Sequence, residues 1–184
     1  FSQLIYVKFT PTALQSYDGN IVVGGGGATS INVAASGSGI NTAPTVTAGA
    51  ATGVGISSAT VPGTITSIGC SAISAYGVEY STTASFANGT GTAVAGSNLS
   101  GNNFSVALSG LSTGTTFYYH TYATNNGGTS YSAEGSFTTL TPTLSVDPLT
   151  GCGNVCTGTT AGPNTFTITG TNLSPADVTV AALS

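Results

Sequence analysis

The stretch that decides the fold is residues 104–139, FSVALSGLSTGTTFYYHTYATNNGGTSYSAEGSFTT. Its first run, residues 104–108, alternates apolar with small residues, which is the period of a β-strand. Two further runs, residues 111–125 and 131–139, are rich in aromatic and β-branched residues, and Asn and Gly between them favour a turn. Successive strand patterns joined by turn residues predict antiparallel β structure.

The same pattern extends over the rest of the chain. Helix signals are nearly absent, and turn residues interrupt the apolar runs every ten residues or so, which is typical of a β-sandwich. We therefore expect an all-β protein. Further strands are expected at residues 4–9, 16–23, 30–34, 59–66, 76–81, 142–146, 165–173 and 178–180.

Three glycine-containing stretches should shape the strands. Asp18-Gly19 suits a tight turn, so residues 16–23 are expected to form a hairpin. Gly24 to Gly27 is expected to form a second turn before the return strand. Pro62-Gly63 interrupts an apolar run, and because proline lacks a ladder donor we expect an edge strand or a bulge there.

The composition excludes several classes of protein. Charged residues make up 3% of the chain, against about 25% in an average soluble domain. One Lys or Arg and a net charge of −4 argue against nucleic-acid binding, which depends on clustered cations. No apolar run is long enough for a transmembrane helix. The chain starts with neither Met nor a signal peptide, so we expect a segment of a longer precursor.

Cysteine pairing stays open at this point. The chain has Cys70, Cys152 and Cys156, an odd number. The C-x3-C spacing predicts a Cys152–Cys156 disulfide, worth about 2 kcal/mol by chain entropy. The competing hypotheses are that one of the two pairs with Cys70 or stays reduced. Cys70 is otherwise expected to be free and buried, and too few ligands exist for zinc.

The central stretch resembles a known family. The pattern L-x-G-L-x-x-G-T-x-F-Y-Y-x-x-Y-A-T-N, followed by GGTSY and SFTT, is similar to the second half of a fibronectin type III domain. The resemblance implies such a module over residues 41–141, with Leu111 and Tyr118 at the corner that the family builds around a tyrosine. Animal members carry a core tryptophan, and here Tyr76 or Tyr80 is expected to replace it.

The two ends resemble parts of another module. Large bacterial surface proteins of the Bacteroidetes group carry such fibronectin-like modules together with immunoglobulin-like repeats. Residues 142–184 are similar to the opening strands of these repeats, and residues 1–40 to their closing strands. The order is thus closing half, complete module 41–141, opening half. Half a sandwich leaves an apolar face and unpaired edges, so we expect the ends to lie on opposite sides of the central module and to be completed by adjacent copies.

The sequence also indicates which residues form the core and whether any could be catalytic. Alternation and the resemblance place eight positions in the central core: Val78, Tyr80, Phe104, Val106, Leu108, Leu111, Phe117 or Tyr118, and Phe137. His120, the only histidine, is expected to face solvent, and Glu79 and Glu134 to be surface groups rather than a catalytic pair. No calcium loop or phosphate-binding loop is apparent. We therefore expect neither an enzyme nor a cofactor.

The resemblance implies a structural and adhesive role in a long filament at the cell surface. It points to the large extracellular adhesins of gliding Bacteroidetes, whose partners would be adjacent copies of the repeat and surface polysaccharide or solid surfaces. One alternative is a spacer or carbohydrate-binding module of a secreted enzyme, for which Tyr118, Tyr122 and Tyr131 are candidates for an exposed aromatic strip. Another is a self-assembling subunit whose half-sandwiches are completed by neighbouring chains.

Overall fold

A computed structural model describes residues 2–148, 156–159, 165–173 and 178–179. These residues form twelve strands and no helix, which confirms the all-β prediction. It follows that no helix in this part of the chain is long and apolar enough to cross a membrane.

The strands fall into four sheets. In chain order they are β1 (Ser16–Gly25), β2 (Ala28–Ser38), β3 (Thr45–Ala48), β4 (Ser58–Ser67), β5 (Ala75–Ser81), β6 (Thr92–Ala95), β7 (Asn103–Ser109), β8 (Thr116–Asn125), β9 (Gly128–Tyr131), β10 (Gly135–Thr138), β11 (Thr143–Val146) and β12 (Ile168–Thr171). The sequence patterns did not predict β6, which is short and rich in Ala.

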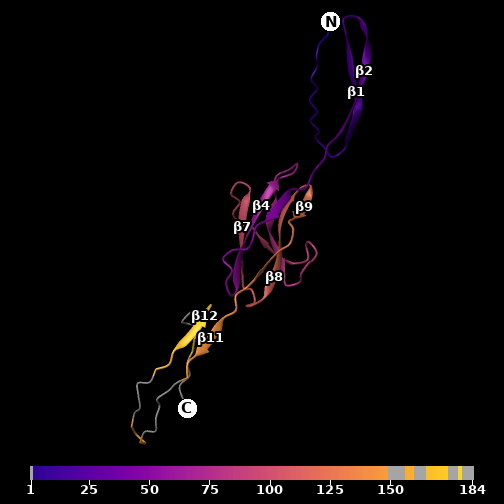
Figure 1. Ribbon diagram of the computed structural model, residues 1–184. Helices are drawn as coiled ribbons and strands as arrows, with labels where there is room; N and C mark the ends of the chain where they lie inside the picture. The colour runs from indigo at the N-terminus through magenta and orange to yellow at the C-terminus, as the bar shows by residue number, and fades with distance from the viewer. Residues whose placement is uncertain (1, 149–155, 160–164, 174–177, 180–184) are drawn as a thin grey trace.

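A two-sheet sandwich occupies the middle of the molecule (Figure 1). One sheet has the order β3-β4-β7, and the other has the order β10-β8-β5-β6 with β9 also paired to β8. All these pairings are antiparallel, and the buried apolar side chains of both sheets form one cluster. Two antiparallel sheets packed over a shared core are an immunoglobulin-like or fibronectin-like sandwich.

Alternation identified most of the core correctly. Seven expected residues are buried: Val78, Phe104, Val106, Leu108, Leu111, Phe117 and Phe137. Tyr80 is only partly buried, and like Tyr76 it packs against this core. The ring centroid of Tyr80 lies 5.8 Å from that of Phe117, and the ring centroid of Tyr76 lies 5.0 Å from that of Phe104. Each tyrosine thus supplies an aromatic contact in a core without tryptophan.

Tyr118, which the resemblance assigns to the family corner, does not point into the core. The register of β8 points Phe117 and Tyr119 inward, so Tyr118 lies on the outer face and is half-buried. Tyr119 is the buried tyrosine. Its hydroxyl donates to the Gly49 carbonyl over 2.9 Å and accepts from the Ala51 N–H over 3.2 Å, which satisfies the polar end of the ring.

Pro62 lies neither on an edge strand nor at a bulge. Strand β4 is central in its sheet, and it pairs continuously with β7 through Pro62. The Pro62 carbonyl accepts from the Gly49 N–H over 2.9 Å, so this residue's backbone groups face the side on which β3 has ended at Ala48. The missing N–H therefore removes no bond of the β4–β7 ladder.

The N-terminal hairpin pairs β1 with β2 over nine registered positions. Its turn is Gly26-Gly27, with φ of 64° and 80°, the positive values that a two-residue hairpin turn requires. The turn expected at Asp18-Gly19 was wrong, since both residues lie within the ladder opposite Ser36 and Ala35. Only one of the two turns can form in this ladder. A turn at Gly26-Gly27 lets β1 pair with β2 along its length and so gives the longer hairpin.

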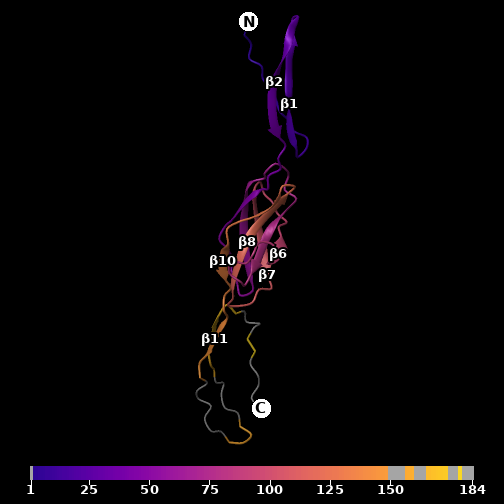
Figure 2. The same ribbon diagram turned by 90° about the vertical axis from the view of Figure 1, so that its right-hand side faces the viewer.

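Residues 4–9 do not form the expected strand. A strand requires a partner for its backbone groups, and this segment extends beside the hairpin without pairing to it (Figures 1 and 2). At the other end, β11 and β12 pair from Thr143 with Thr171 to Val146 with Ile168. Residues 178–179 are not in a strand, and residue 180 lies outside the described part of the chain.

The two hairpins lie at opposite ends of the sandwich in both views (Figures 1 and 2), as the order of the fragments predicts. Asn125, at the end of β8, anchors the N-terminal connection. Its buried amide donates to the Thr42 carbonyl over 2.9 Å and to the Ile68 carbonyl over 2.8 Å. These bonds tie the segment that follows the hairpin to the top of the sandwich.

Candidate functional site

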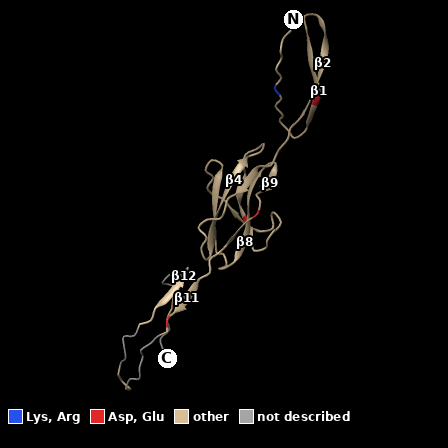
Figure 3. Ribbon diagram, viewed as in Figure 1, with Lys and Arg blue, Asp and Glu red and all other residues tan. Residues whose placement is uncertain are grey.

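The outer face of the β10-β8-β5-β6 sheet carries the only charged groups of the sandwich. They are Glu79 and Glu134, and Asp and Glu residues are red in Figure 3; the single Lys or Arg of the chain, Lys8, lies on the segment before β1. Register places Glu79 directly opposite His120 on neighbouring strands. The sheet therefore gathers on one face the titratable residues that the sequence left dispersed.

A β-bulge brings Glu134 to His120. The β8–β9 pairs match Tyr122 with Tyr131, whereas the β8–β10 pairs match Tyr119 with Gly135, so the register slips by one residue between them. Where the register slips, the Thr121 N–H donates to the side-chain Oγ of Ser132 over 3.0 Å in place of a backbone carbonyl. Bulges commonly re-aim side chains next to sites.

His120 is buried, at 7% exposed, so the prediction that it faces solvent was wrong. Its Nδ1 lies 3.0 Å from the Ser132 carbonyl, which can only accept, so Nδ1 carries the proton in the neutral ring. Nε2 has no hydrogen-bond partner and lies 3.9 Å from Glu134 Oε2. Ser132 Oγ donates to the Ala133 carbonyl and is not paired with the ring, so these residues do not form a nucleophile–base pair.

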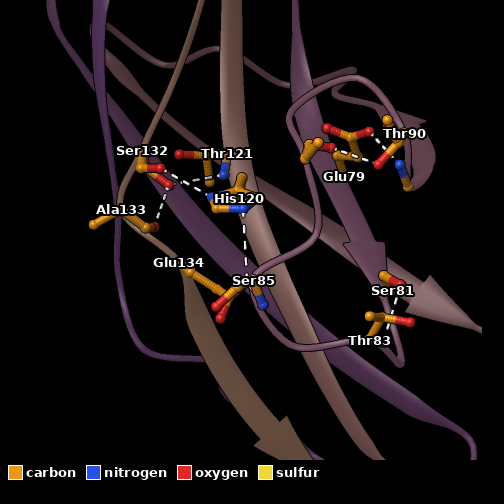
Figure 4. Close-up of polar contacts among 12 residues, drawn as sticks. Glu79, Ser81, Thr83, Ser85, Thr90, His120, Thr121, Ser132, Ala133 and Glu134 are labelled. Atoms are coloured by element: carbon orange, nitrogen blue, oxygen red, sulfur yellow. Dashed lines mark hydrogen bonds and ion pairs between the residues drawn. The ribbon is translucent and has the colours of Figure 1, made fainter.

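The loop between β5 and β6 covers His120 and is held there by hydrogen bonds to Glu79 and Glu134 (Figure 4). Glu79 accepts hydrogen bonds from the Gly89 and Gly91 N–H groups, and Glu134 accepts one from the Ser85 N–H over 2.8 Å. The Phe86 ring then packs on the imidazole with ring centroids 4.8 Å apart. The expectation of two surface acids therefore fails for Glu79, which is 2% exposed.

The expected aromatic strip is divided. Tyr122 and Tyr131 lie together, with ring centroids 6.1 Å apart and planes inclined by 44°. Tyr118 is four positions along β8 from Tyr122, a separation of about 13 Å in a strand. Phe86 on His120 fills the space between, so the three tyrosines do not form one flat platform.

A cavity of about 280 Å³ opens beside the tyrosine pair. It is lined by Glu79, Gly89, Gly91, Ala93, Tyr122, Thr124, Thr129 and Tyr131. Burial, the Glu79 carboxylate and the neighbouring Tyr122 together raise the pKa of the Tyr131 phenol. Sequence reasoning missed this pocket, and the only signal for it was the N-G-T-G run at residues 88–91, where two small residues bracket a turn.

The cysteines are placed only in part. Cys70 is exposed rather than buried, at the junction between the N-terminal hairpin and the sandwich. The Thr42 hydroxyl donates to its Sγ over 3.2 Å, and this hydrogen bond lowers the pKa of the thiol. Cys156 is also exposed, but Cys152 lies outside the described residues, so the Cys152–Cys156 disulfide stays a prediction.

Comparison with known proteins adds little to this geometry. No family model and no curated protein matches the chain. Among solved structures, the sensor domain of the anti-sigma factor RsgI4 from Pseudobacteroides cellulosolvens is 19% identical with a TM-score of 0.39, covering 53% of this chain and 94% of its own. The chicken CNTN1 FN1–FN3 domains are 16% identical with a TM-score of 0.40, covering 70% of this chain and 42% of their own. At such low scores neither likeness supports an inference about function.

Metal ligands are not clustered in the described ranges. Residues 2–148, 156–159, 165–173 and 178–179 contain no group of three or more His, Cys, Asp or Glu side chains placed to hold an ion. The arrangement on the outer face thus has two chemical capacities. It fixes a loop through two carboxylates, and it leaves a pocket with an acidic and aromatic lining.

Proposed function

We propose that the chain is a repeat segment of a secreted structural or adhesive protein at the cell surface. The type is that of the large adhesins of gliding Bacteroidetes, which the sequence resembles. Such a segment acts through reach and contact rather than catalysis. The observation that supports the proposal is that two-stranded sheets, each only part of a sandwich, lie at opposite ends of a complete sandwich.

Among the described residues, no second sheet covers the apolar face of the N-terminal hairpin. Register brings Ile21 opposite Val33 and Val23 opposite Ile31, so all four side chains lie on one face. Ile31 is 69% exposed, and Val23 and Val33 are exposed as well. Phe9 covers only the near end of this face, where its ring meets Tyr17 at 5.6 Å.

The C-terminal hairpin also has an exposed apolar face. Leu144 and Val146 of β11 lie on the same face as Ile168 of β12, and the first two are exposed. Two half-sandwiches with apolar faces at opposite ends favour head-to-tail association, since such contacts continue into a filament when they do not close. The low charge of the chain favours close approach of two copies, because there is little electrostatic repulsion between them.

Sedimentation velocity over a concentration series tests the association directly. We expect the wild-type chain to form head-to-tail species as its concentration rises. The double substitution Ile31→Ser/Val33→Ser, on the apolar face, should abolish them. Val22→Ser is the matched control, because Val22 is exposed on the opposite face of the same hairpin.

Monomeric wild-type protein at every concentration would argue against completion by neighbouring copies. Equal loss of association in the Val22→Ser control would show that hydrophobic surface in general, and not this face, drives it. A denaturing gel of native material then separates the two forms of the proposal. One very long chain stays near the top, whereas separate subunits run near the 17.8 kDa of this chain.

A further inference from the structure

We infer that the pocket beside Glu79 on the outer face of the sandwich binds an alkylammonium group. This site is separate from the two hairpins, and the inference does not rest on their association. It follows from the burial of the Glu79 carboxyl, the geometry of two tyrosines and the composition of the pocket wall.

Glu79 is a buried acid without a counter-ion. It is 2% exposed, and its carboxylate accepts only the N–H groups of Gly89 and Gly91. Among the described residues, the one ion-pair contact joins His120 and Glu134, so no cation lies against Glu79. Buried charges are normally paired, and two backbone dipoles neutralise a carboxylate only partly. The pocket that touches it therefore favours a positively charged ligand.

The two tyrosines form walls rather than a platform. Tyr122 leans across β8 onto β5, where it occupies the space left by the missing side chain of Gly77. Tyr131 faces the loop, with its hydroxyl near Gly89. With centroids 6.1 Å apart and planes inclined by 44°, the two rings pack against each other, and their inclined surface suits a compact group that contacts both from the pocket better than a flat sugar ring. Ring faces attract ammonium groups through their quadrupole.

The rest of the lining is neutral. Thr124 and Thr129 close one side with hydroxyls 2.8 Å apart, and Ala93 closes another. Glu79 is the only charged residue that lines the pocket. Burial first, and the Glu79 carboxylate second, raise the pKa of Tyr131 in this wall. An anion would be repelled, and a neutral alcohol would leave the carboxylate without its partner.

The ammonium group has two possible sources with the same chemistry. One is a free amine such as choline. The other is Lys8 of a second copy, since Lys8 is the only Lys or Arg in the sequence and is exposed on the extended segment before β1.

Titration followed by NMR tests the inference with the full chain. The probes are choline and its neutral isostere 3,3-dimethylbutan-1-ol, and the readouts are the amide shifts of Gly89 and Gly91. We expect choline to shift both amides and to bind at least about tenfold more tightly than the alcohol, given the usual strength of desolvated cation–π contacts. Equal affinities, or no shift by choline, would overturn the inference.

Variants locate the site. Glu79→Gln and Tyr131→Leu should each weaken choline binding about tenfold or more, while Tyr131→Phe keeps the ring and the affinity. Glu134→Gln is the matched control, because it removes an acid on the same face that does not line the pocket. Equal weakening by Glu134→Gln and Glu79→Gln would contradict the assignment.

A second substitution covers the case in which Glu79→Gln loosens the loop. Ala93→Phe, on the outer face beside Glu79, fills the pocket without touching the core and should abolish binding. Unchanged choline affinity in this variant would overturn the inference.

Lys8→Gln distinguishes the sources. If Lys8 of a second copy is the ligand, raising the concentration of the wild-type protein shifts Gly89 and Gly91, and Lys8→Gln removes this effect while choline still binds. If the ligand is a free amine, both proteins respond to choline alone.

Discussion

The central sandwich and the N-terminal hairpin use the same sequence pattern with opposite results. Ile65 in β4 is 1% exposed, whereas Ile31 in β2 is 69% exposed. Both lie in antiparallel ladders, Ile65 opposite Val46 and Ile31 opposite Val23, and both alternate with small polar residues. The ladder therefore satisfies the backbone in each region, and only a second sheet converts the apolar face into a core.

The difference shows what a hairpin lacks on its own. Burying one isoleucine side chain contributes about 1.5–3 kcal/mol, and the hairpin leaves its apolar face largely in water. An isolated two-stranded hairpin is marginally stable at best. The hairpin should consequently depend on outside contacts far more than the sandwich does.

The same substitution in both regions gives the largest expected contrast. Ile65→Ala should lower the free energy of unfolding by about 2–5 kcal/mol, because it leaves a cavity in a packed core. Ile31→Ala should change it by less than about 0.5 kcal/mol, as is usual at an exposed site. Urea unfolding followed by tyrosine fluorescence measures both. Similar losses in the two variants would show that the hairpin is buried within one chain.

A second prediction concerns the junction of the two regions. Asn125→Asp replaces an amide donor with a carboxylate that faces the Thr42 and Ile68 carbonyls. We expect a loss of about 1–3 kcal/mol, the usual cost of an unsatisfied buried group. Asn126→Asp is the matched control at an exposed position. Equal unfolding midpoints in urea for the two variants would mean that Asn125 does not anchor the connection.

The third prediction is a small pH effect confined to the sandwich. The pKa of Tyr131 is raised in the folded protein, chiefly by burial. Its contribution to stability is therefore complete below the ordinary tyrosine pKa of about 10 and is lost as the pH rises through the folded value. Tyr131→Phe should reduce the fall in unfolding free energy above that pH. An unchanged slope in urea titrations would contradict the assignment.

The smallest effect is expected at the junction thiol. Thr42→Val removes the hydroxyl that donates to Cys70 and lowers its pKa. The thiolate fraction at mildly alkaline pH should fall, and alkylation of Cys70 by iodoacetamide should slow. Thr42→Ser keeps the hydroxyl and should react as the wild type does. Mass spectrometry of the Cys70 peptide follows the reaction, and equal rates in all three proteins would rule out this hydrogen bond as the cause.

Sequence alone predicted the sandwich because its patterns are local. Phe104, Val106 and Leu108 alternate cleanly, and their burial follows from a period of two. A shift of one position exchanges the faces of a strand. Phe117 and Tyr118 could therefore not be told apart from the sequence, since both are aromatic and only the pairing of β8 decides which of them points inward.

The site on the outer face was beyond the reach of such patterns. Glu79, His120 and Glu134 come from separate strands, and their meeting depends on a bulge and on a loop that folds back over the sheet. The prediction of a strand at residues 4–9 was wrong for a related reason. Their composition favours a strand, but no strand among the described residues pairs with them.

Hydrogen–deuterium exchange over a concentration series shows whether a neighbouring copy completes the N-terminal hairpin. We predict that amides of β1 and β2 exchange quickly in dilute protein and become protected as the chain associates, while β4, β5 and β8 stay protected throughout. Protection of β1 and β2 equal to that of the sandwich at the lowest concentration, with no change on concentrating, would contradict completion by a neighbouring copy.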